Sequence, residues 1–137
     1  MSRITLVTGL WDIKRSELSA EWNRSFEGHY IEKFKELLKL PYNLVIFGDE
    51  KLEELVWKHR EGGNTDFIRK EIDWFKEHFY NDIQTIRNNP KWYSQAPWLK
   101  ESAQGQLEMY NPLVMAKMFL LNDAKHYVDS DYYFWID

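Results

Sequence analysis

Apolar residues form two kinds of pattern in this chain: short continuous runs and longer stretches with helical spacing. The continuous runs at residues 4–8 and 43–48 contain residues that favour strands, and each run reaches a glycine. Both are typical of buried strands. The run at 43–48 is apolar almost throughout, which indicates burial on both faces of a parallel sheet. A third strand is predicted at residues 132–136, after the turn at residues 129–131.

Helical spacing predicts two helices in the first half of the chain. Apolar residues recur at steps of three and four from Trp22 to Leu38, and Pro41 closes that helix. A second helix follows Asp49, whose side chain is suited to cap it, and ends at Gly62-Gly63.

The second half of the chain is predicted to hold two more helices, with a long loop between them. From Ile68 to Ile86 apolar residues alternate steps of four and three, which predicts one long helix that stops at residues 88–90. Residues 91–109 show no period and are predicted to be an ordered loop, a kind of segment that is usually functional when it is this long. The last helix, residues 113–124, follows Asn111-Pro112, a pair typical of a helix start.

Strands separated by helices predict an α/β fold with a Rossmann-like, mostly parallel sheet and helices on both of its faces. Residues 1–137 are expected to form a single domain. Three strands are few for such a sheet, where about five or six are typical, and the sequence stops directly after an apolar strand. We therefore expect the chain to be the N-terminal portion of a larger domain; the alternative is a natural terminus that docks as an edge strand.

Composition excludes several classes of function. The 137 residues carry 18 Lys and Arg against 22 Asp and Glu, a net charge of −4 that does not suit an electrostatic nucleic-acid binder. Cysteine is absent, which excludes thiol catalysis, disulfide scaffolds and cysteine-based zinc sites. No stretch approaches the ~18 consecutive apolar residues of a membrane span. We expect a cytoplasmic protein, with peripheral attachment to a membrane left open.

Candidate binding residues lie where the predicted strands end, because ligands of open parallel sheets bind beyond the carboxyl ends of the strands. Thr8, Gly9 and Asp12 follow the first strand, and Asp137 follows the last. A carboxylate leaving a buried strand is suited to hold Mg²⁺ or Mn²⁺. The alternative for Asp137 is a solvated strand end.

Two basic residues are further candidates. Lys117 lies within an otherwise apolar helix, so its ammonium must be paired, reach solvent or enter a pocket that holds an anion. Arg60, next to the glycines that end the second helix, either binds phosphate or only favours the helix C-terminus. Dinucleotide, P-loop, metalloprotease and α/β-hydrolase motifs are missing from the sequence.

Several segments resemble the HtrL/YibB (WlaTC-like) family. They are residues 4–15 (ITLVTGLWDIKR), 44–49 (LVIFGD), 110–124 (YNPLVMAKMFLLNDA) and 133–137 (YFWID), and the resemblance covers essentially the whole chain. Much of that family is described as being of unknown function. It is similar to a branch of the nucleotide-sugar glycosyltransferases with the GT-A fold.

The GT-A resemblance implies roles for the candidate residues. Thr8, Gly9 and Asp12 would hold the nucleotide, while Lys117 and Arg60 would face the phosphates of the nucleotide-sugar donor. Asp137 matches the first position of an Asp-x-Asp motif, and would bind a divalent cation, Mn²⁺ or Mg²⁺. The resemblance puts the acceptor-binding half and any catalytic base downstream, so no catalytic residue is assigned.

The sequence therefore favours a glycosyltransferase that moves a sugar from a nucleoside-diphosphate donor to a glycan or other acceptor. One alternative is a non-catalytic α/β binding module that presents the aromatic segment 91–109, with Trp92, Tyr93 and Trp98, to a partner or glycan. Another is an inactive fragment, because an isolated sheet with a bare edge tends to aggregate.

Overall fold

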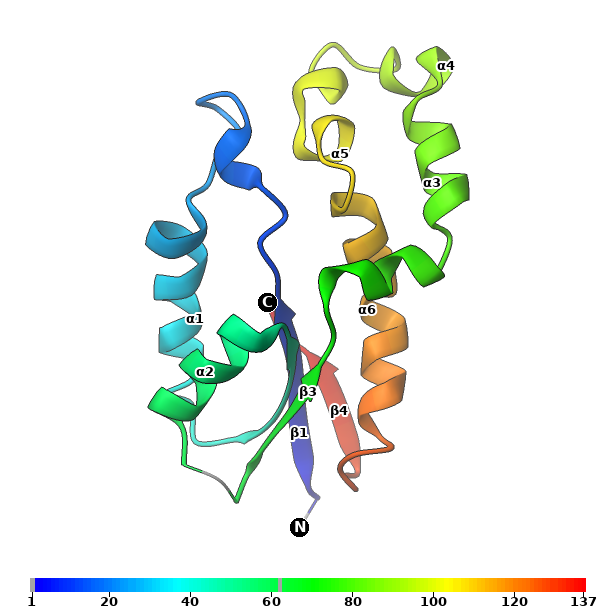
Figure 1. Ribbon diagram of the computed structural model, residues 1–137. Helices are drawn as coiled ribbons and strands as arrows, with labels where there is room; N and C mark the ends of the chain where they lie inside the picture. The colour runs from blue at the N-terminus through cyan, green and yellow to red at the C-terminus, as the bar shows by residue number, and fades with distance from the viewer. Residues whose placement is uncertain (1, 62) are drawn as a thin grey trace. The chain divides into compact units, whose positions relative to one another are not determined.

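The structure is a computed structural model that describes residues 2–61 and 63–137, and Figure 1 shows the order of its elements. The strands are β1 (Ile4–Leu10), β2 (Asn43–Gly48), β3 (Thr65–Arg69) and β4 (Tyr132–Trp135). The helices, where η marks 3-10 or π geometry, are η1 (Arg15–Glu17), η2 (Phe26–Ile31), α1 (Glu32–Leu37), α2 (Glu50–His59), η3 (Ile72–Glu77), α3 (Tyr80–Arg87), α4 (Pro90–Tyr93), η4 (Leu99–Glu101), α5 (Ala103–Gln106) and α6 (Tyr110–Ala124).

These elements belong to two compact units. The sheet unit comprises Met1–Trp11, Lys33–Ile72 and Lys117–Asp137, and it contains the strands. The helical unit comprises Asp12–Glu32 and Asp73–Ala116. Helix α6 begins in the helical unit and ends in the sheet unit. A single domain over residues 1–137 therefore stays a prediction.

The described strands of the sheet unit form a four-stranded parallel sheet in the order β3-β2-β1-β4. Val7 of β1 lies opposite Val45 on one side and Trp135 on the other. The chain moves outward from β1 to β2 and β3, and then returns to place β4 on the free side of β1. The predicted α/β fold with a parallel sheet is confirmed.

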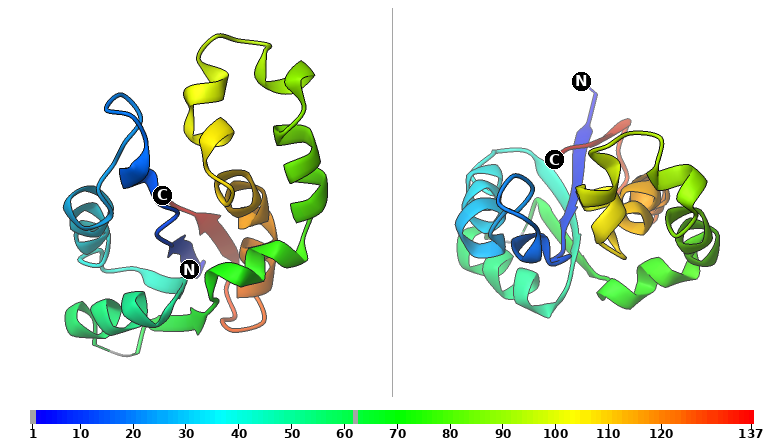
Figure 2. Two further views of the ribbon diagram at one scale, coloured as in Figure 1. Left: turned by 45° about the horizontal axis from the view of Figure 1, so that its top comes forward. Right: turned by 90° about the horizontal axis from the view of Figure 1, so that it is seen from above.

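Helices cover both faces of this sheet. Helices α1 and α2 lie on one face, and the part of α6 that belongs to the sheet unit lies on the other (Figures 1 and 2). Strand β2 is buried from Leu44 to Gly48, and Leu44, Val45, Ile46 and Phe47 have no exposed surface. The burial predicted for residues 43–48 is confirmed, and this strand forms the centre of the hydrophobic core.

The long helix predicted from Ile68 to Ile86 is wrong in its first half. Residues 65–69 form β3, which pairs with β2 from Leu44 opposite Thr65 to Gly48 opposite Arg69. The following residues form the 3-10 helix η3, and Phe79 takes a left-handed φ of 51° before α3 begins. The spacing of apolar residues fits a helix, but pairing with the exposed edge of β2 satisfies the backbone of residues 65–69 instead. The predicted stop before residues 88–90 is confirmed, because α3 ends at Arg87.

Two other predictions need correction. The helix predicted from Trp22 begins only at Phe26, where the Ser25 hydroxyl accepts a hydrogen bond from the backbone N–H of Gly28 at 3.0 Å. Residues 91–109 are not one loop, because they contain most of α4, together with η4 and α5.

The remaining boundaries follow the sequence closely. Asp49 caps α2, β4 begins at the predicted Tyr132, and α6 includes the predicted residues 113–124. Gly63 has a φ of 105°, which suits a glycine after α2, while Gly62 of the predicted Gly62-Gly63 stop lies outside the described residues.

Candidate functional site

The strand order identifies one place in the sheet unit where a ligand is most easily accommodated. The connections from β1 lead to β2 on one side, whereas the later connection from β3 returns to β4 on the other side. The carboxyl ends of β1 and β4 therefore flank the topological switch point, where open α/β sheets bind their ligands. The end of β1 carries Thr8 and Gly9, and Asp137 follows β4.

A cluster of three side chains lies at the end of β4. Lys117 Nζ donates a hydrogen bond to Asp137 Oδ1 at 2.8 Å, and Trp135 Nε1 donates to the same oxygen at 2.8 Å. Lys117 Nζ also lies 5.7 Å from the centre of the Trp135 ring, within the range of a cation–π contact. The structure thus brings together two of the predicted site residues, Lys117 and Asp137.

Strand and helix geometry explain this cluster. Trp135 is the last residue of β4 and Asp137 lies two residues further on, and both contact Lys117 of α6. Along α6, Ala116 and Leu120 are buried, while the Lys117 side chain keeps 28% of its surface exposed. The sequence left three possibilities for this ammonium, and the structure shows an ion pair with Asp137.

The cluster favours the ionised form of Asp137. Partial burial alone raises the pKa of this carboxyl group, but hydrogen bonds from Lys117 and Trp135 and the charge of the ammonium outweigh that effect, so its pKa lies below the ordinary value of 3.8. The Asp137 side chain is 73% exposed, so the carboxylate and ammonium are both open to a ligand.

The end of β1 offers backbone more than side chains. Thr8 is buried, with 2% of its surface exposed. A Cβ at Gly9 would lie 2.6 Å from the Trp11 ring and 2.9 Å from the carbonyl oxygen of Phe47, so a side chain does not fit there. Trp11 is itself held by a hydrogen bond from its Nε1 to the carbonyl oxygen of Lys70 at 2.7 Å. Sequence reasoning placed Gly9 at the site; the structure adds that packing against Trp11 requires the glycine.

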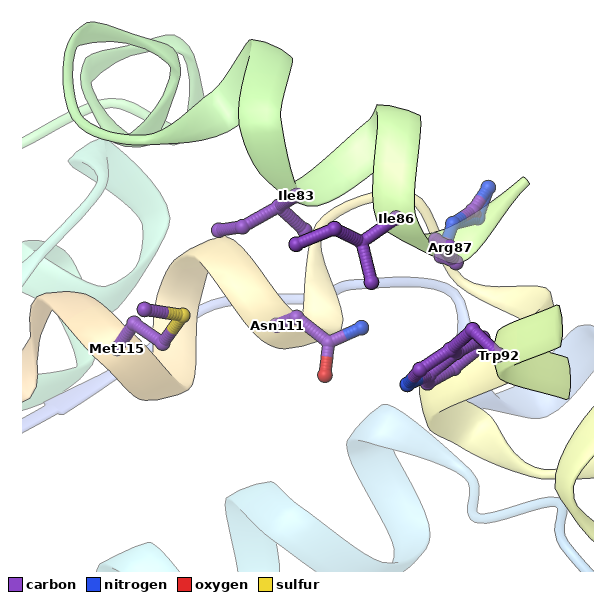
Figure 3. A pocket seen from close by; sticks show the side chains of 6 residues that line it. All are labelled: Ile83, Ile86, Arg87, Trp92, Asn111 and Met115. Carbon is purple, nitrogen blue, oxygen red and sulfur yellow. The ribbon is translucent and has the colours of Figure 1, made fainter. Parts of the chain in front are cut away.

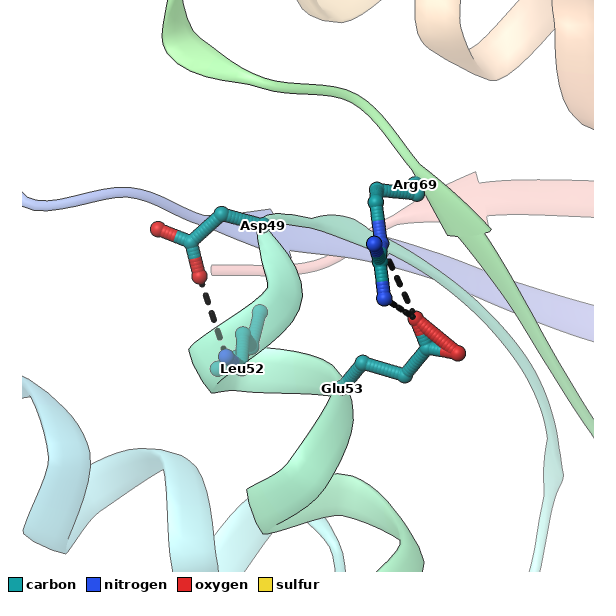
Figure 4. A network of polar contacts seen from close by, with 4 residues as sticks. All are labelled: Asp49, Leu52, Glu53 and Arg69. Carbon is teal, nitrogen blue, oxygen red and sulfur yellow. Dashed lines mark hydrogen bonds and ion pairs between the residues drawn. The ribbon is translucent and has the colours of Figure 1, made fainter.

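Side chains at the ends of β2 and β3 contact helix α2. Asp49 Oδ1 accepts a hydrogen bond from the backbone N–H of Leu52 at 3.0 Å, and Arg69 Nη2 lies 3.0 Å from Glu53 Oε2 (Figure 4). Lys70, directly after β3, lies 3.8 Å from Asp123. These charged groups stabilise local structure, and Arg69 and Lys70 were missed as neighbours of this edge because β3 was not predicted.

Arg60 lies at the opposite edge of the sheet, where the strands begin. Its guanidinium donates to the carbonyl oxygens of Leu38, Leu40 and Tyr42 at 2.8–3.0 Å, and also to Asn64 Oδ1 and Thr65 Oγ1. Burial lowers the pKa of this guanidinium. The structure does not bring Arg60 together with Lys117 and Asp137, and its contacts favour a structural role at the entry to β2 and β3.

Asp12 belongs to the helical unit. It is exposed, and its Oδ1 accepts a hydrogen bond from the backbone N–H of Lys14 at 2.9 Å. Lys14 has a left-handed φ of 71°, so the carboxylate stabilises the turn that follows Trp11. The hydrogen bond from Lys14 gives Asp12 a structural role in this turn, and its exposed carboxylate remains accessible to a ligand.

A divalent cation fits these residues poorly. Mg²⁺ and related cations take several oxygen ligands, commonly from carboxylates. Within residues 2–61 and 63–137, no group of three or more His, Cys, Asp or Glu side chains is arranged to hold a metal ion. Asp137 also already pairs with the ammonium of Lys117. The predicted Mn²⁺ or Mg²⁺ at Asp137 stays a prediction without support from this geometry.

The helical unit contains a pocket of about 170 Å³ between α3, α4 and α6. Figure 3 shows the side chains that line it, which are Ile83, Ile86, Arg87, Trp92, Asn111 and Met115. Trp98, the other tryptophan of segment 91–109, stacks on Trp22 with ring centres 6.2 Å apart. The aromatic segment therefore forms part of a mostly apolar pocket and of a separate indole pair.

None of the helices in the described part of the chain has the length and apolar character needed to cross a membrane. The family comparison gives one match: the model of the family described as "Bacterial protein of unknown function (HtrL_YibB)" matches residues 2–137. No curated protein and no solved structure matches the chain.

Proposed function

The chain belongs to the HtrL_YibB family, and on that premise we propose that it is a glycosyltransferase whose nucleoside-diphosphate-sugar donor binds at the carboxyl ends of β1 and β4. The observation that carries the proposal is an accessible ammonium, Lys117, beside the topological switch point of a parallel sheet. The resemblance to GT-A enzymes supports the choice of donor.

The proposed reaction transfers the sugar from the diphosphate to a hydroxyl group of a glycan or other acceptor. The acceptor oxygen forms a bond to the anomeric carbon as the bond from that carbon to the diphosphate oxygen breaks. The hydroxyl proton passes to solvent, and the bond electrons leave with the diphosphate. Lys117 would stabilise this added negative charge, as preorganised cations do for other leaving groups. Backbone groups at Thr8 and Gly9 would contact the nucleotide.

Ligand-observed NMR offers a direct test of donor binding. Saturation of the protein should reach the base and ribose protons of UDP-glucose, UDP-galactose or GDP-mannose when the protein is mixed with each in turn. Lys117→Met should weaken that signal, because it removes the ammonium. Lys125→Met, which removes an exposed lysine just beyond α6, serves as the matched control and should leave the signal unchanged. If no saturation passes from the protein to any of the three donors, with or without Mn²⁺, the proposal is rejected.

The pocket of the helical unit favours a second candidate function, a non-catalytic binding module. Trp92 lines that pocket, and Trp98 is 52% exposed. Under this alternative, Trp92→Ala and Trp98→Ala abolish binding of a glycan or protein partner, while nucleotides never bind. Trp57→Ala is the control, because Trp57 is a similarly exposed tryptophan, 44%, on α2 of the sheet unit.

A further inference from the structure

We infer that Asp137 and Trp135 are positioning residues for Lys117, and that the ammonium they hold binds the donor diphosphate without a divalent cation at Asp137. This inference rests on the proposed function and concerns how the same site works. It differs from the role that the GT-A resemblance gives to Asp137, which is that of a metal ligand.

One carboxylate oxygen of Asp137 already accepts two hydrogen bonds. Both Lys117 Nζ and Trp135 Nε1 donate to Oδ1, each at 2.8 Å. A cation coordinated by the same oxygen would lie close to the ammonium, and the two positive charges would repel each other. Asp137 therefore suits an ammonium partner better than a metal ion in this arrangement.

The Lys117 ammonium keeps N–H donors for a ligand after it pairs with Asp137. A lysine ammonium carries three N–H donors, and Asp137 takes one of them. The centre of the Trp135 ring lies 5.7 Å from Nζ, and this cation–π contact also favours an ammonium held beside β4. Two N–H donors then remain for phosphate oxygens, at a group whose side chain keeps 28% of its surface exposed. A fixed ammonium loses less conformational entropy on binding than a free one.

Calorimetric titration with UDP-glucose and GDP-mannose tests this inference, with each protein measured in EDTA and again in Mn²⁺. The wild-type chain should bind one donor with the same affinity in both buffers. Lys117→Met and Asp137→Asn should each weaken binding roughly tenfold in both buffers, the ratio that one hydrogen bond to a charged group is worth. Asp123→Asn is the control. Asp123 lies on α6, as Lys117 does, but its ion-pair partner is Lys70, so this change should leave donor affinity unchanged.

The double variant gives the sharpest distinction between positioning and metal binding. If Asp137 acts through Lys117, then Lys117→Met with Asp137→Asn should bind no more weakly than Lys117→Met alone. Trp135→Phe keeps an aromatic ring beside Lys117 but removes the indole N–H, so it should cause a smaller loss of affinity than Asp137→Asn.

Other outcomes would overturn the inference in recognisable ways. Donor binding that occurs only with Mn²⁺, and that Asp137→Asn removes, makes Asp137 a metal ligand and leaves the proposed function intact. Tighter binding by Asp137→Asn shows that the carboxylate opposes the diphosphate rather than positioning its partner. Failure of the wild-type chain to bind either donor in both buffers rejects the proposed function, and the inference with it.

Discussion

Replacing Arg60 with methionine should destabilise the protein strongly while leaving the proposed donor site in place. The guanidinium is buried, with 9% of the residue exposed, and it joins three backbone carbonyls before β2 to Asn64 and Thr65 at the start of β3. Methionine keeps much of the apolar stem but donates no hydrogen bond. The variant therefore removes the hydrogen bonds that connect these two segments.

The burial of the hydrogen bonds of Arg60 determines how much unfolding free energy the variant should lose. The contacts to the carbonyl oxygen of Leu38 and to Thr65 Oγ1 are buried, and the other three are partly buried. A buried polar group left without its partner costs about 1–3 kcal/mol, and Arg60→Met leaves two buried acceptors in that state, the Leu38 carbonyl and Thr65 Oγ1. We expect Arg60→Met to lower the free energy of unfolding by about 3–5 kcal/mol, a large share of the ~5–15 kcal/mol typical of domains.

Urea denaturation followed by tryptophan fluorescence, together with thermal unfolding, measures this loss. The midpoint temperature should fall by roughly 10–20 °C. Arg60→Lys should recover little, since an ammonium lacks the planar fork of five donors. Arg69→Met is the matched control, because its ion pair with Glu53 is solvent-exposed and should contribute little to the free energy of unfolding. A stable Arg60→Met protein that no longer binds nucleotides would refute the reasoning and make Arg60 a phosphate ligand.

Three further predictions follow from single contacts. Gly9→Ala should cost about 1–3 kcal/mol or more of unfolding free energy in chemical denaturation, because its Cβ would overlap the Trp11 ring and a backbone oxygen. Asp49→Ala should cost about 1 kcal/mol in the same assay, since it removes the cap of α2, and an unchanged midpoint would contradict that role. The pKa of Asp137, followed by NMR of its carboxyl carbon, should lie below 3.8 and rise in Lys117→Met. Because the folded-state pKa is lowered, the stabilisation from this pair is complete above the ordinary value and is lost as pH falls through the lowered pKa.

The sequence predicts a strand well where a continuous run of apolar residues is enough to identify it. Residues 44–48 are apolar throughout and form the buried centre of the sheet, and the β4 run begins where expected. β3 could not be found in this way, because Ile68 and Ile72 have the spacing of a helix. Its strand conformation depends on pairing with β2, a contact between residues about twenty positions apart. The switch point between β1 and β4 depends on the strand order, which the spacing of apolar residues does not determine.

The candidate site was predicted in part. Lys117 and Asp137 could be chosen singly, because one is a charge in an apolar helix and the other follows a buried strand. Their ion pair joins residues twenty positions apart and depends on how α6 packs on the sheet. Trp135 was missed, although it lies only two residues before Asp137 and an extended backbone places side chains two apart on the same side. The role of Arg60 could not be predicted, since its acceptors are mostly backbone carbonyls, which carry no side-chain signal.

The most direct test of the central claim is isothermal titration calorimetry of the wild-type chain and Lys117→Met with UDP-sugars and GDP-sugars. The account predicts that at least one donor binds the wild-type chain, and that Lys117→Met binds it roughly tenfold more weakly while unfolding at the same midpoint. Equal affinity of the two proteins, or no heat of binding from any donor, would contradict the claim that the switch point beside Lys117 is a nucleotide-sugar site.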